Sequence, residues 1–557
     1  MKAYIGSLLV LLLMGSINVW AQGDDDAVIF KAMEDEMNRM NRGMKELKQA
    51  DSKPICCIGV NAVYGRTFMV RGILGGIIQS DIIPVSYGSV NVLAGDYNFT
   101  SQIKYPNELE RHQLFSLPVV PDYDQIRRGI WGAMDATYKN AQKQIYRKQA
   151  YFDNIVIPEE EKKIIPFPKI EPVSRIVEPR DEYSIDQAYW ENYIKELSGI
   201  FKNYKDVIFS SIYVMGKDLE IYQMNTEGIK VKQPVRFVYL FCNASIRDAE
   251  GVSSNYQLTE SAICPQDMPS LDEMKKKVTD MAETLVKMKN APKFEGDYTG
   301  PILYLDDACQ TFLLGGDLFG VSSRYVAARK TEDPGLYSQY KPTLENKIGQ
   351  SVTHTALTVK NYSSMYDYKG FKLMGAYEVD AEGIIPEKEM TLIEKGVLKQ
   401  PLSSRTRSVY TEKSTGSMRW TGNGSSIVCP GTLHVSADKG YSQEELKKML
   451  IKEAKKQKLN CAYIVRGNYG AYFEEIYRVN LKTGEETLVF AAQTPRESWG
   501  WMGSAMAFSE EEGMVNIPAF ELPVSLIYPN GVLFKKAKIS EIKEKEKPMI
   551  LTRPLDR

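Results

Sequence analysis

The tetrapeptide Asp-Ala-Glu-Gly occurs twice in this chain, at 248–251 and at 380–383. Two carboxylates placed two residues apart can divide the acid and base roles of a catalyst if their surroundings separate their pKa values. Asp and Gly are also typical of solvated turns, because Gly adopts positive φ and Asp bonds to nearby main-chain N–H groups. We therefore expect turns at both copies, with an acid pair at Asp380 and Glu382 as the alternative. The sequences flanking the copies differ, which argues against an internal repeat.

The other residue types that carry chemistry are scattered. The three histidines, His112, His354 and His434, are isolated, and the last two alternate with apolar residues as in strands, so we expect structural roles for them. Among the seven cysteines no CxxC or Cys/His cluster occurs, and Cys56 and Cys57 are expected to be core residues of a buried strand. No P-loop, GxGxxG or G-x-S-x-G motif is present.

Two further segments allow more than one interpretation. Residues 421–426, "TGNGSS", are expected to form a polar loop; a serine nucleophile there would need a His base that only the fold could supply. Trp499 and Trp501 are expected to pack in the core or anchor a loop, with a ligand groove as the alternative.

The N-terminus predicts the location of the protein. Lys2, the apolar run at 8–14 and a small-residue site ending at Ala21 are typical of a signal peptide, and the apolar part is short for a membrane span. We expect the mature chain to begin near Gln22, to have no membrane span and to be secreted or periplasmic. Lysines and arginines number 70 against 71 acidic residues, so nucleic acid is not an expected partner.

The pattern of elements predicts an α+β protein. After the signal peptide (1–21) we expect an N-terminal α/β-type domain at 22–120, a middle α+β domain at 121–297, and a large, mostly antiparallel β domain at 298–557. Prolines at 158, 166, 168, 172 and 179 predict an extended connector at 157–180.

Local signals predict individual elements. Methionines at 33, 37, 40 and 44 form one apolar stripe of a helix, and a second long helix is expected to begin at Asp122 or Asp124. Capping boxes precede two further helices, at Ser270/Glu273 and Ser442/Glu445. Around the second acidic tetrapeptide we expect a meander: a strand at 375–380 and two runs joined by a hairpin turn at Lys395–Gly396.

Six sequence blocks, taken in order, resemble the TldD/PmbA family, also known as the "modulator of DNA gyrase" family. The most specific is "YEVDAEGIIPEKEMTLIEKGVLKQPLSSR", which is similar to the family's signature hairpin. The other five are "VNVLAGDYNFTS", "YQMNTEG", "DYTGPILYLDDACQTF", "YSQEELKKMLIKEAKKQKLNCAYIVRG" and the terminal "YPNGVLFKKAKISEIKEKEKPMILTRPL". The resemblance covers nearly the whole mature chain.

The resemblance implies the three-part architecture given above, a dimer-like assembly around a cavity, and proteolysis of peptides or unfolded segments. The catalytic branch of the family carries a His-Glu-x-x-x-His helix and a downstream Cys as metal ligands. Here the corresponding segment, 300–325, contains no His and no Glu, although zinc hydrolysis uses imidazole ligands and a carboxylate base. This chain therefore resembles the branch without the metal motif.

The candidate ligands that remain in the segment are Asp306, Asp307, Cys309 and Asp317, and we expect the first two to cap a helix. Cys461 lies before the position of the family's ligand Cys, inside a buried strand pattern. No catalytic, cofactor-binding or metal-binding residue is therefore carried over, and no cofactor is expected.

Three functions stay open at this point. The first is a metal-free, non-catalytic protein that binds peptides or unfolded segments at strand edges, as a homodimer or as the partner of a metal-bearing TldD-like paralogue. The second is an active metallopeptidase with a non-standard site built from Asp317, Cys309 or His354. The third is a structural envelope protein.

Overall fold

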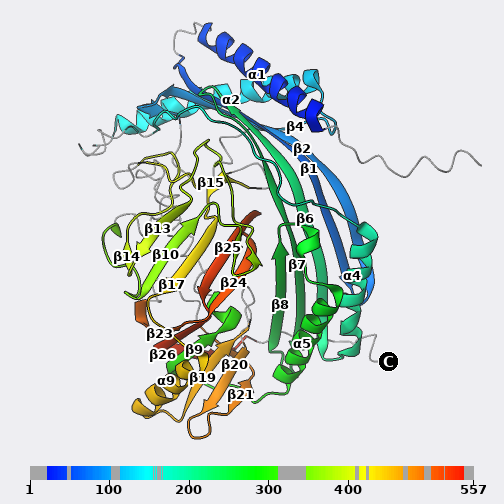
Figure 1. The fold of residues 1–557 in the computed structure, drawn as a ribbon, viewed down its shortest axis with the longest axis vertical. Coiled ribbons are helices and arrows are strands. Elements are labelled where there is room, and N and C mark those ends of the chain that lie inside the picture. The colour runs from blue at the N-terminus through cyan, green and yellow to red at the C-terminus, as the bar shows by residue number, and fades with distance from the viewer. Residues whose placement is uncertain are drawn as a thin grey trace, which may run out of the picture.

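A computed structural model describes residues 22–46, 52–101, 113–154, 156, 159, 165, 167–310, 347–407, 413–421, 426–467, 475–494, 503–519 and 521–544. His112, Asp317, Trp499 and Trp501 lie outside these residues. Figure 1 shows one long curved sheet that carries helices on its outer face, while the C-terminal sheets lie against its inner side. Within the described ranges, no helix is both long enough and apolar enough to cross a membrane.

The long sheet has eight strands in the order β3-β2-β1-β6-β7-β5, with β4 added to β2 and β8 added to β7. Their bounds are β1 Ile55–Ile73, β2 Gly76–Asp96, β3 Phe99–Thr100, β4 Gln113–Ser116, β5 Ser174–Ile176, β6 Val207–Asn225, β7 Lys230–Arg247 and β8 Ser253–Ala262. All of these pairs are antiparallel except β5 with β7. The sheet combines strands from both 22–120 and 121–297, so the expected division near residue 120 does not separate two sheets.

Helices cover the outer face of the long sheet at its two ends. At one end, α1 (Gln22–Glu46) and α2 (Tyr123–Phe152) share a core with Val60 and Ala62 of β1. At the other end, α4 (Gln187–Gly199), η2 (Ile200–Asn203) and α5 (Leu271–Lys289) share a core with Phe68 and Val70 of the same strand. All four of these β1 residues have even numbers and so lie on the same face of the sheet. The two pairs lie towards opposite ends of the strand, so β1 contributes to two separate cores.

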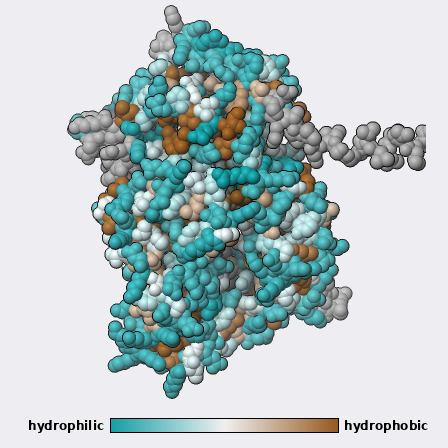
Figure 2. Space-filling view, in the orientation of Figure 1, coloured by the Kyte–Doolittle hydropathy of each residue, from teal (hydrophilic) through white to brown (hydrophobic). Residues whose placement is uncertain are grey.

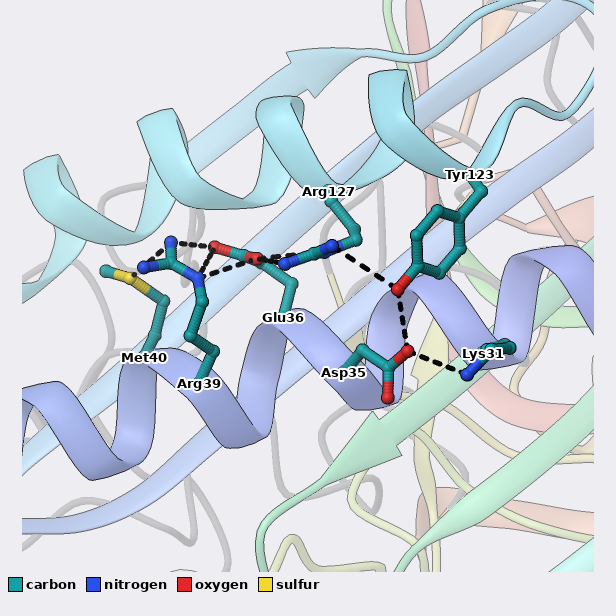
Figure 3. Close-up of polar contacts among 7 residues, drawn as sticks. All are labelled: Lys31, Asp35, Glu36, Arg39, Met40, Tyr123 and Arg127. Carbon is teal, nitrogen blue, oxygen red and sulfur yellow. Dashed lines mark hydrogen bonds and ion pairs between the residues drawn. The ribbon is translucent and has the colours of Figure 1, made fainter.

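Polar side chains join α1 to α2 (Figure 3). Glu36 is almost fully buried, and one of its carboxylate oxygens lies 3.1 Å from a guanidinium nitrogen of Arg127. Tyr123 donates its hydroxyl to Asp35 at 2.7 Å. Buried charge is tolerated here because each carboxylate has a hydrogen-bonding partner on the other helix.

The C-terminal part contains two larger sheets and two short hairpins. The six-stranded sheet comprises, in spatial order, β14 Val397–Leu398, β13 Glu389–Glu394, β10 Leu357–Tyr362, β17 Thr432–Ala437, β25 Leu522–Pro529 and β24 Glu512–Ala519. The eight-stranded sheet comprises β18 Gly440–Tyr441, β23 Ala505–Ser509, β26 Gly531–Glu541, β9 Asp297–Leu305, β19 Cys461–Arg466, β20 Glu475–Asn480 and β21 Glu486–Val489, with β22 Ala492–Gln493 on β26. The hairpins are β11 Asp367–Tyr368 with β12 Phe371–Lys372, and β15 Met418–Trp420 with β16 Ser426–Val428.

The remaining described helical segments are η3 Pro265–Asp267, η4 Asp306–Cys309 and α9 Gln443–Lys456. The mixed, mostly antiparallel α+β architecture confirms the predicted fold class.

Several local predictions are confirmed. Both capping boxes form, with Ser270 before α5 and Ser442 before α9. The side chain of Asp122 accepts a bond from the N–H of Gln125, which places it at the start of α2. Lys395 and Gly396 both have positive φ, as the turn between β13 and β14 requires.

Two local predictions are wrong. Residues 375–380 form no strand, because the main chain there bonds to side chains and loops: the hydroxyl of Ser525 accepts from Gly375 N–H and the carbonyl of Ser363 accepts from Tyr377 N–H. His354 precedes β10 instead of lying in a strand, and its Nδ1 accepts a bond from the N–H of Ala356.

From residue 167 on, the Pro-rich connector contains no helix before α4. Ser174–Ile176 add to the edge of β7 in parallel as β5. The connector thus closes part of the long sheet's edge and leads into α4.

Candidate functional site

The two acidic tetrapeptides fold into the same turn, as predicted. Oδ1 of Asp380 accepts bonds from the N–H groups of Glu382 and Ile384 at 2.9 and 2.8 Å. Oδ1 of Asp248 accepts from the residues at the same two offsets, also at 2.9 and 2.8 Å. The Gly at the fourth position has positive φ in both copies. Shared local chemistry therefore accounts for the repeated sequence.

A third segment makes the same turn with Asn in place of Asp. Oδ1 of Asn225 accepts from the N–H groups of Glu227 and Ile229 at 2.9 and 3.1 Å, and Gly228 has a φ of 98°. The three segments share the pattern Asp/Asn-x-Glu-Gly followed by Ile or Val. This third copy joins β6 to β7 and faces the C-terminal part of the chain.

The surroundings of the two Asp turns differ sharply. Asp248 pairs with the ammonium of Lys293 at 2.6 Å; although partial burial acts to raise its pKa, hydrogen bonds from Lys293 and the turn lower it. Asp380 is 1 % exposed and makes no ion pair among the described residues; its Oδ2 accepts from the N–H of Met418 at 3.2 Å. Burial raises the pKa of Asp380 to about 7, against the effect of the three N–H donors.

Arg405 joins the turn at Asn225 to the turn at Asp380. Its guanidinium binds both carboxylate oxygens of Glu227, at 2.6 and 2.5 Å, and its main-chain N–H donates to Glu382. Its Nε donates to the carbonyl of Pro168 at 2.7 Å, and its guanidinium lies over the ring of Phe167 at 3.8 Å. One side chain thus holds the long sheet, the connector and the C-terminal domain together.

The ion pair is buried, since the side chains of Arg405 and Glu227 are 3 % and 2 % exposed. The carboxylate of Glu227 accepts two further hydrogen bonds, from the thiol of Cys57 and the hydroxyl of Tyr97. Burial, with Glu227 adding to it, raises the pKa of Cys57 well above its usual value, so the thiolate nucleophile does not form. The cluster is chemically suited to holding elements in place, because every charged atom is engaged within the protein.

Trp420 lines two cavities, and the smaller of them borders this cluster. The larger, which we name the cleft, has a volume of about 140 Å³ and lies between β7, the connector and the C-terminal segments around residues 373–379 and 522–523. Its walls are mainly apolar, and they include Val235, Ala376 and Leu522. The smaller cavity, about 70 Å³, is lined by polar side chains such as Asn61 and Gln223. The cleft has room for an apolar side chain, whereas the smaller cavity suits ordered water.

The outer surface also has separate apolar and hydrophilic regions. Figure 2 shows a mostly hydrophilic face with apolar patches gathered towards the end that carries α1 and α2, and a recess where the C-terminal sheets meet the long sheet. The cleft residues Ile263 and Pro523 come from this junction, at the end of β8 and the start of β25.

The described part of the segment expected to carry the family's metal motif does not suit a metal. Asp306 accepts bonds from Arg466, Gln443 and Asn530. Cys309 is buried, its pKa is raised well above its usual value by burial, and its thiol donates to the carbonyl of Tyr304. These groups are committed to the protein's own hydrogen bonds, so the donor set does not fit zinc.

Asp306 and Asp307 lie in η4, and the helix that they were expected to cap would lie beyond Gln310, outside the described residues. Leu305 precedes η4 and makes no side-chain cap, and Asp306 itself has a positive φ of 56°. Asp307 instead accepts a bond from the side chain of Gln310, three residues later. Burial raises the pKa of Asp307.

The remaining candidates are separate from one another. His354 packs against Phe508, while His434 of β17 pairs through Nε2 with Glu512 at 2.7 Å. Cys461 is half-buried at the start of β19, in agreement with the strand pattern. Across the described ranges, no three His, Cys, Asp or Glu side chains are grouped so that they could hold a metal ion.

Sequence reasoning did not identify Arg405 or Glu227, which are 178 residues apart. No local pattern marks such a pair. The shared Asp/Asn-x-Glu-Gly pattern was the one available signal, because it would have grouped Glu227 with Glu382 before the structure was known.

Comparison with known proteins agrees with this architecture. Residues 336–480 match the sequence pattern of the PmbA/TldA metallopeptidase C-terminal domain. No curated protein matches the sequence of this chain.

Solved structures share the fold at low sequence identity. A protein described as a modulator of a DNA gyrase from Thermotoga maritima is 15% identical, with a TM-score of 0.59 over 91% of this chain and 100% of that one. TldE from Thermococcus kodakarensis is 13% identical, with a TM-score of 0.58 over 91% and 100%. A protein described as a modulator of DNA gyrase from Bacteroides thetaiotaomicron is 13% identical, with a TM-score of 0.54 over 93% and 99%. The matched domain and the shared fold agree: residues 336–480 match the C-terminal domain of PmbA/TldA metallopeptidases, and the chain shares the fold of these solved structures.

Proposed function

We propose that this protein is exported and binds peptides or unfolded polypeptide segments without cleaving them. It acts as a homodimer or as the partner of a metal-bearing paralogue. The observation that carries the proposal is the edge of β7, which already accepts an extended segment of the chain itself, β5, at 230–232. Strand addition at a sheet edge binds a peptide through main-chain hydrogen bonds.

The same edge continues next to the cleft. On this side of β7, β5 pairs with 230–232 and β8 pairs with 238–247, so in the described part of the chain 233–237 have no strand partner there. Pro234 lies within this gap, where a missing N–H costs no ladder bond. Val235 and Pro234 also line the cleft. A peptide at this edge would place a side chain in the cleft.

The non-catalytic part of the proposal rests on donor chemistry. Asp306 and Cys309 are engaged in internal bonds, and the buried thiol is held protonated. Export rests on the signal-peptide pattern that ends at Ala21, and α1 begins at the next residue, Gln22. Mass spectrometry of the protein recovered from its native host is expected to give a mature chain that begins at Gln22.

Filling the cleft tests the binding proposal. Ala376 is half-buried and lines the cleft, so Ala376→Trp places an indole in a space of about 140 Å³. We expect this variant to bind fluorescein-labelled, reduced and carboxymethylated lactalbumin at least tenfold more weakly than the wild type, measured by anisotropy. Ala150→Trp, on the exposed surface of α2, is the matched control and is expected to bind normally.

Two results would contradict the proposal. Equal binding by Ala376→Trp and wild type would remove the cleft as the site. Appearance of cleavage products from the labelled protein, inhibited by a chelator, would show a metallopeptidase instead.

A further inference from the structure

Residues 169–182, which we name the strap, cross the edge of β7 between two firm anchors. At one end Arg405 holds Phe167 and Pro168. At the other end Tyr183 is buried and donates its hydroxyl to the carbonyl of Phe237 at 2.8 Å. The strap is therefore fixed at both ends independently of what its middle does.

The middle of the strap is held far more weakly. It is attached to β7 by the pairing of the three-residue strand β5 and by two flanking main-chain bonds, from Lys230 N–H to the carbonyl of Val173 at 2.8 Å and from Val177 N–H to the carbonyl of Lys232 at 2.9 Å. All three residues of β5 are exposed, and Ile176 is 61% exposed. A three-residue edge strand with solvent on its outer side is readily displaced.

Three further contacts tie the strap to the C-terminal domain at the rim of the cleft. Arg175 pairs with Glu378 at 3.4 Å, Asp181 lies 3.7 Å from Lys372, and Arg180 lies over the ring of Tyr366 at 3.0 Å. The ion-pair side chains are 35 to 54% exposed, so each pair contributes little, about 0.2–1 kcal/mol.

The strap occupies the place that the proposed function assigns to a bound peptide. Val173 packs against Val231 and Val379, and Val177 and Pro179 line the cleft. Residues 177–181 of the strap all line the cleft, so this part of the strap faces the C-terminal domain. Gly228 allows Pro172 to approach, since a Cβ there would lie 2.9 Å from the proline Cβ.

We propose that the middle of the strap is an internal ligand that occupies the binding edge until an extended polypeptide segment displaces it. The segment recognised has the pattern of the strap: β-branched apolar residues at the positions of Val173 and Val177, an arginine midway between them, and a proline two positions after the second valine. This inference rests on the proposed function and adds the substrate class and a built-in competitor. The anchors at Phe167 and Tyr183 keep the strap near the edge, so it closes again when the segment leaves.

Weakening the rim contacts tests the competition. The probe is a fluorescein-labelled peptide with the sequence of residues 172–182, PVSRIVEPRDE. In the double variant Arg175→Glu/Arg180→Glu, the strap loses its contacts with Glu378 and Tyr366, while the peptide retains its own arginines. Because a competitor in the site reduces apparent affinity in proportion to its occupancy, we expect roughly 3- to 30-fold tighter binding than in wild type.

The matched control is Arg128→Glu/Arg147→Glu, which makes the same charge change on the exposed surface of α2. We expect it to bind the peptide as the wild type does. Hydrogen exchange on the unaltered protein provides a measurement that needs no variant: a saturating concentration of peptide is expected to remove the protection of the Val177 amide.

Each remaining result has a defined meaning. Equal peptide affinity in Arg175→Glu/Arg180→Glu and wild type, or peptide binding that survives Ala376→Trp, overturns the strap inference and leaves the proposed function standing. Failure of every variant to bind the peptide, while unfolded lactalbumin still binds in an Ala376-dependent way, also overturns it. If neither probe binds any variant, the proposed function fails as well.

Discussion

Replacing Asp380 with Asn is expected to remove a large part of the pH dependence of stability. Burial raises the pKa of Asp380 from 3.8 to about 7, so the folded protein holds a proton that the unfolded chain has released. A raised carboxyl pKa makes stability highest at low pH and reduces it as pH rises towards the folded pKa. The window is therefore about pH 4 to 7.

The magnitude follows from the shift. Each pH unit in the window costs the wild type up to ~1.4 kcal/mol of unfolding free energy, and about 2.3 kcal/mol is lost between pH 5 and pH 7, because the carboxyl is already half ionised at pH 7. Asn cannot titrate, so the variant is expected to lack this slope. The turn itself should survive, because Asn225 already makes the same bonds in the turn between β6 and β7.

Asp380→Asn is also expected to lower the free energy of unfolding by a pH-independent amount. Oδ2 of Asp380 accepts from the N–H of Met418, and the amide nitrogen of Asn would place a second donor there. A buried unsatisfied donor costs about 1–3 kcal/mol. We therefore expect Asp380→Asn to be clearly less stable than wild type at pH 5 and to approach or pass it above pH 7.

Urea unfolding at pH 5, 6, 7 and 8 measures the difference between the two proteins. Asp248→Asn is the control, since it alters the same turn at a carboxyl whose pKa is lowered instead; it is expected to lower stability by a constant amount above about pH 4 and so to leave the slope between pH 5 and 7 unchanged. If Asp380→Asn keeps the wild-type slope between pH 5 and 7, the assignment of that slope to the buried carboxyl is wrong.

Three further predictions concern the buried pair and the metal question. Arg405→Met leaves the carboxylate of Glu227 buried without its cation and is expected to lower the free energy of unfolding by about 3–5 kcal/mol, measured with urea. Adding Glu227→Gln to the same chain is expected to recover part of this loss. An unchanged free energy of unfolding in Arg405→Met would show that the pair is not an anchor. Metal analysis of purified protein is expected to find far less than one zinc per chain, and one tightly held zinc would contradict the metal-free proposal. Iodoacetamide is expected to modify Cys309 only after unfolding, because its thiol is buried and its pKa raised; peptide mapping of the native protein checks this.

Local structure was largely predictable from the sequence. Capping boxes, apolar stripes and the Lys395–Gly396 turn depend on residues a few positions apart, and each formed as expected. The strand expected at 375–380 failed for a long-range reason: the hydroxyl of Ser525 and the carbonyl of Ser363 accept the main-chain bonds that a neighbouring strand would otherwise make.

The candidate site was less predictable. The turn at Asp380 was expected, but its burial follows from packing against β1, β6 and Trp420, which no local pattern encodes. The connector was expected to be extended, yet proline content alone does not specify the strand it joins. The parallel pairing with β7 depends on the register of Ser174 with Lys230, 56 positions later.

The order of strands also has a consequence for how the chain reaches its native state. β1 pairs with β6 in a register that joins Gly59 to Asn225, and β9 pairs with β26, which joins Leu305 to Gly531. Contacts between such distant residues form slowly, since a long loop must close before they stabilise anything. The long sheet has all its strands once β8 is made, whereas the eight-stranded sheet stays incomplete until β26, the last strand that the structure describes. Until then the unpaired edge of β9 is open to association with other unfolded chains.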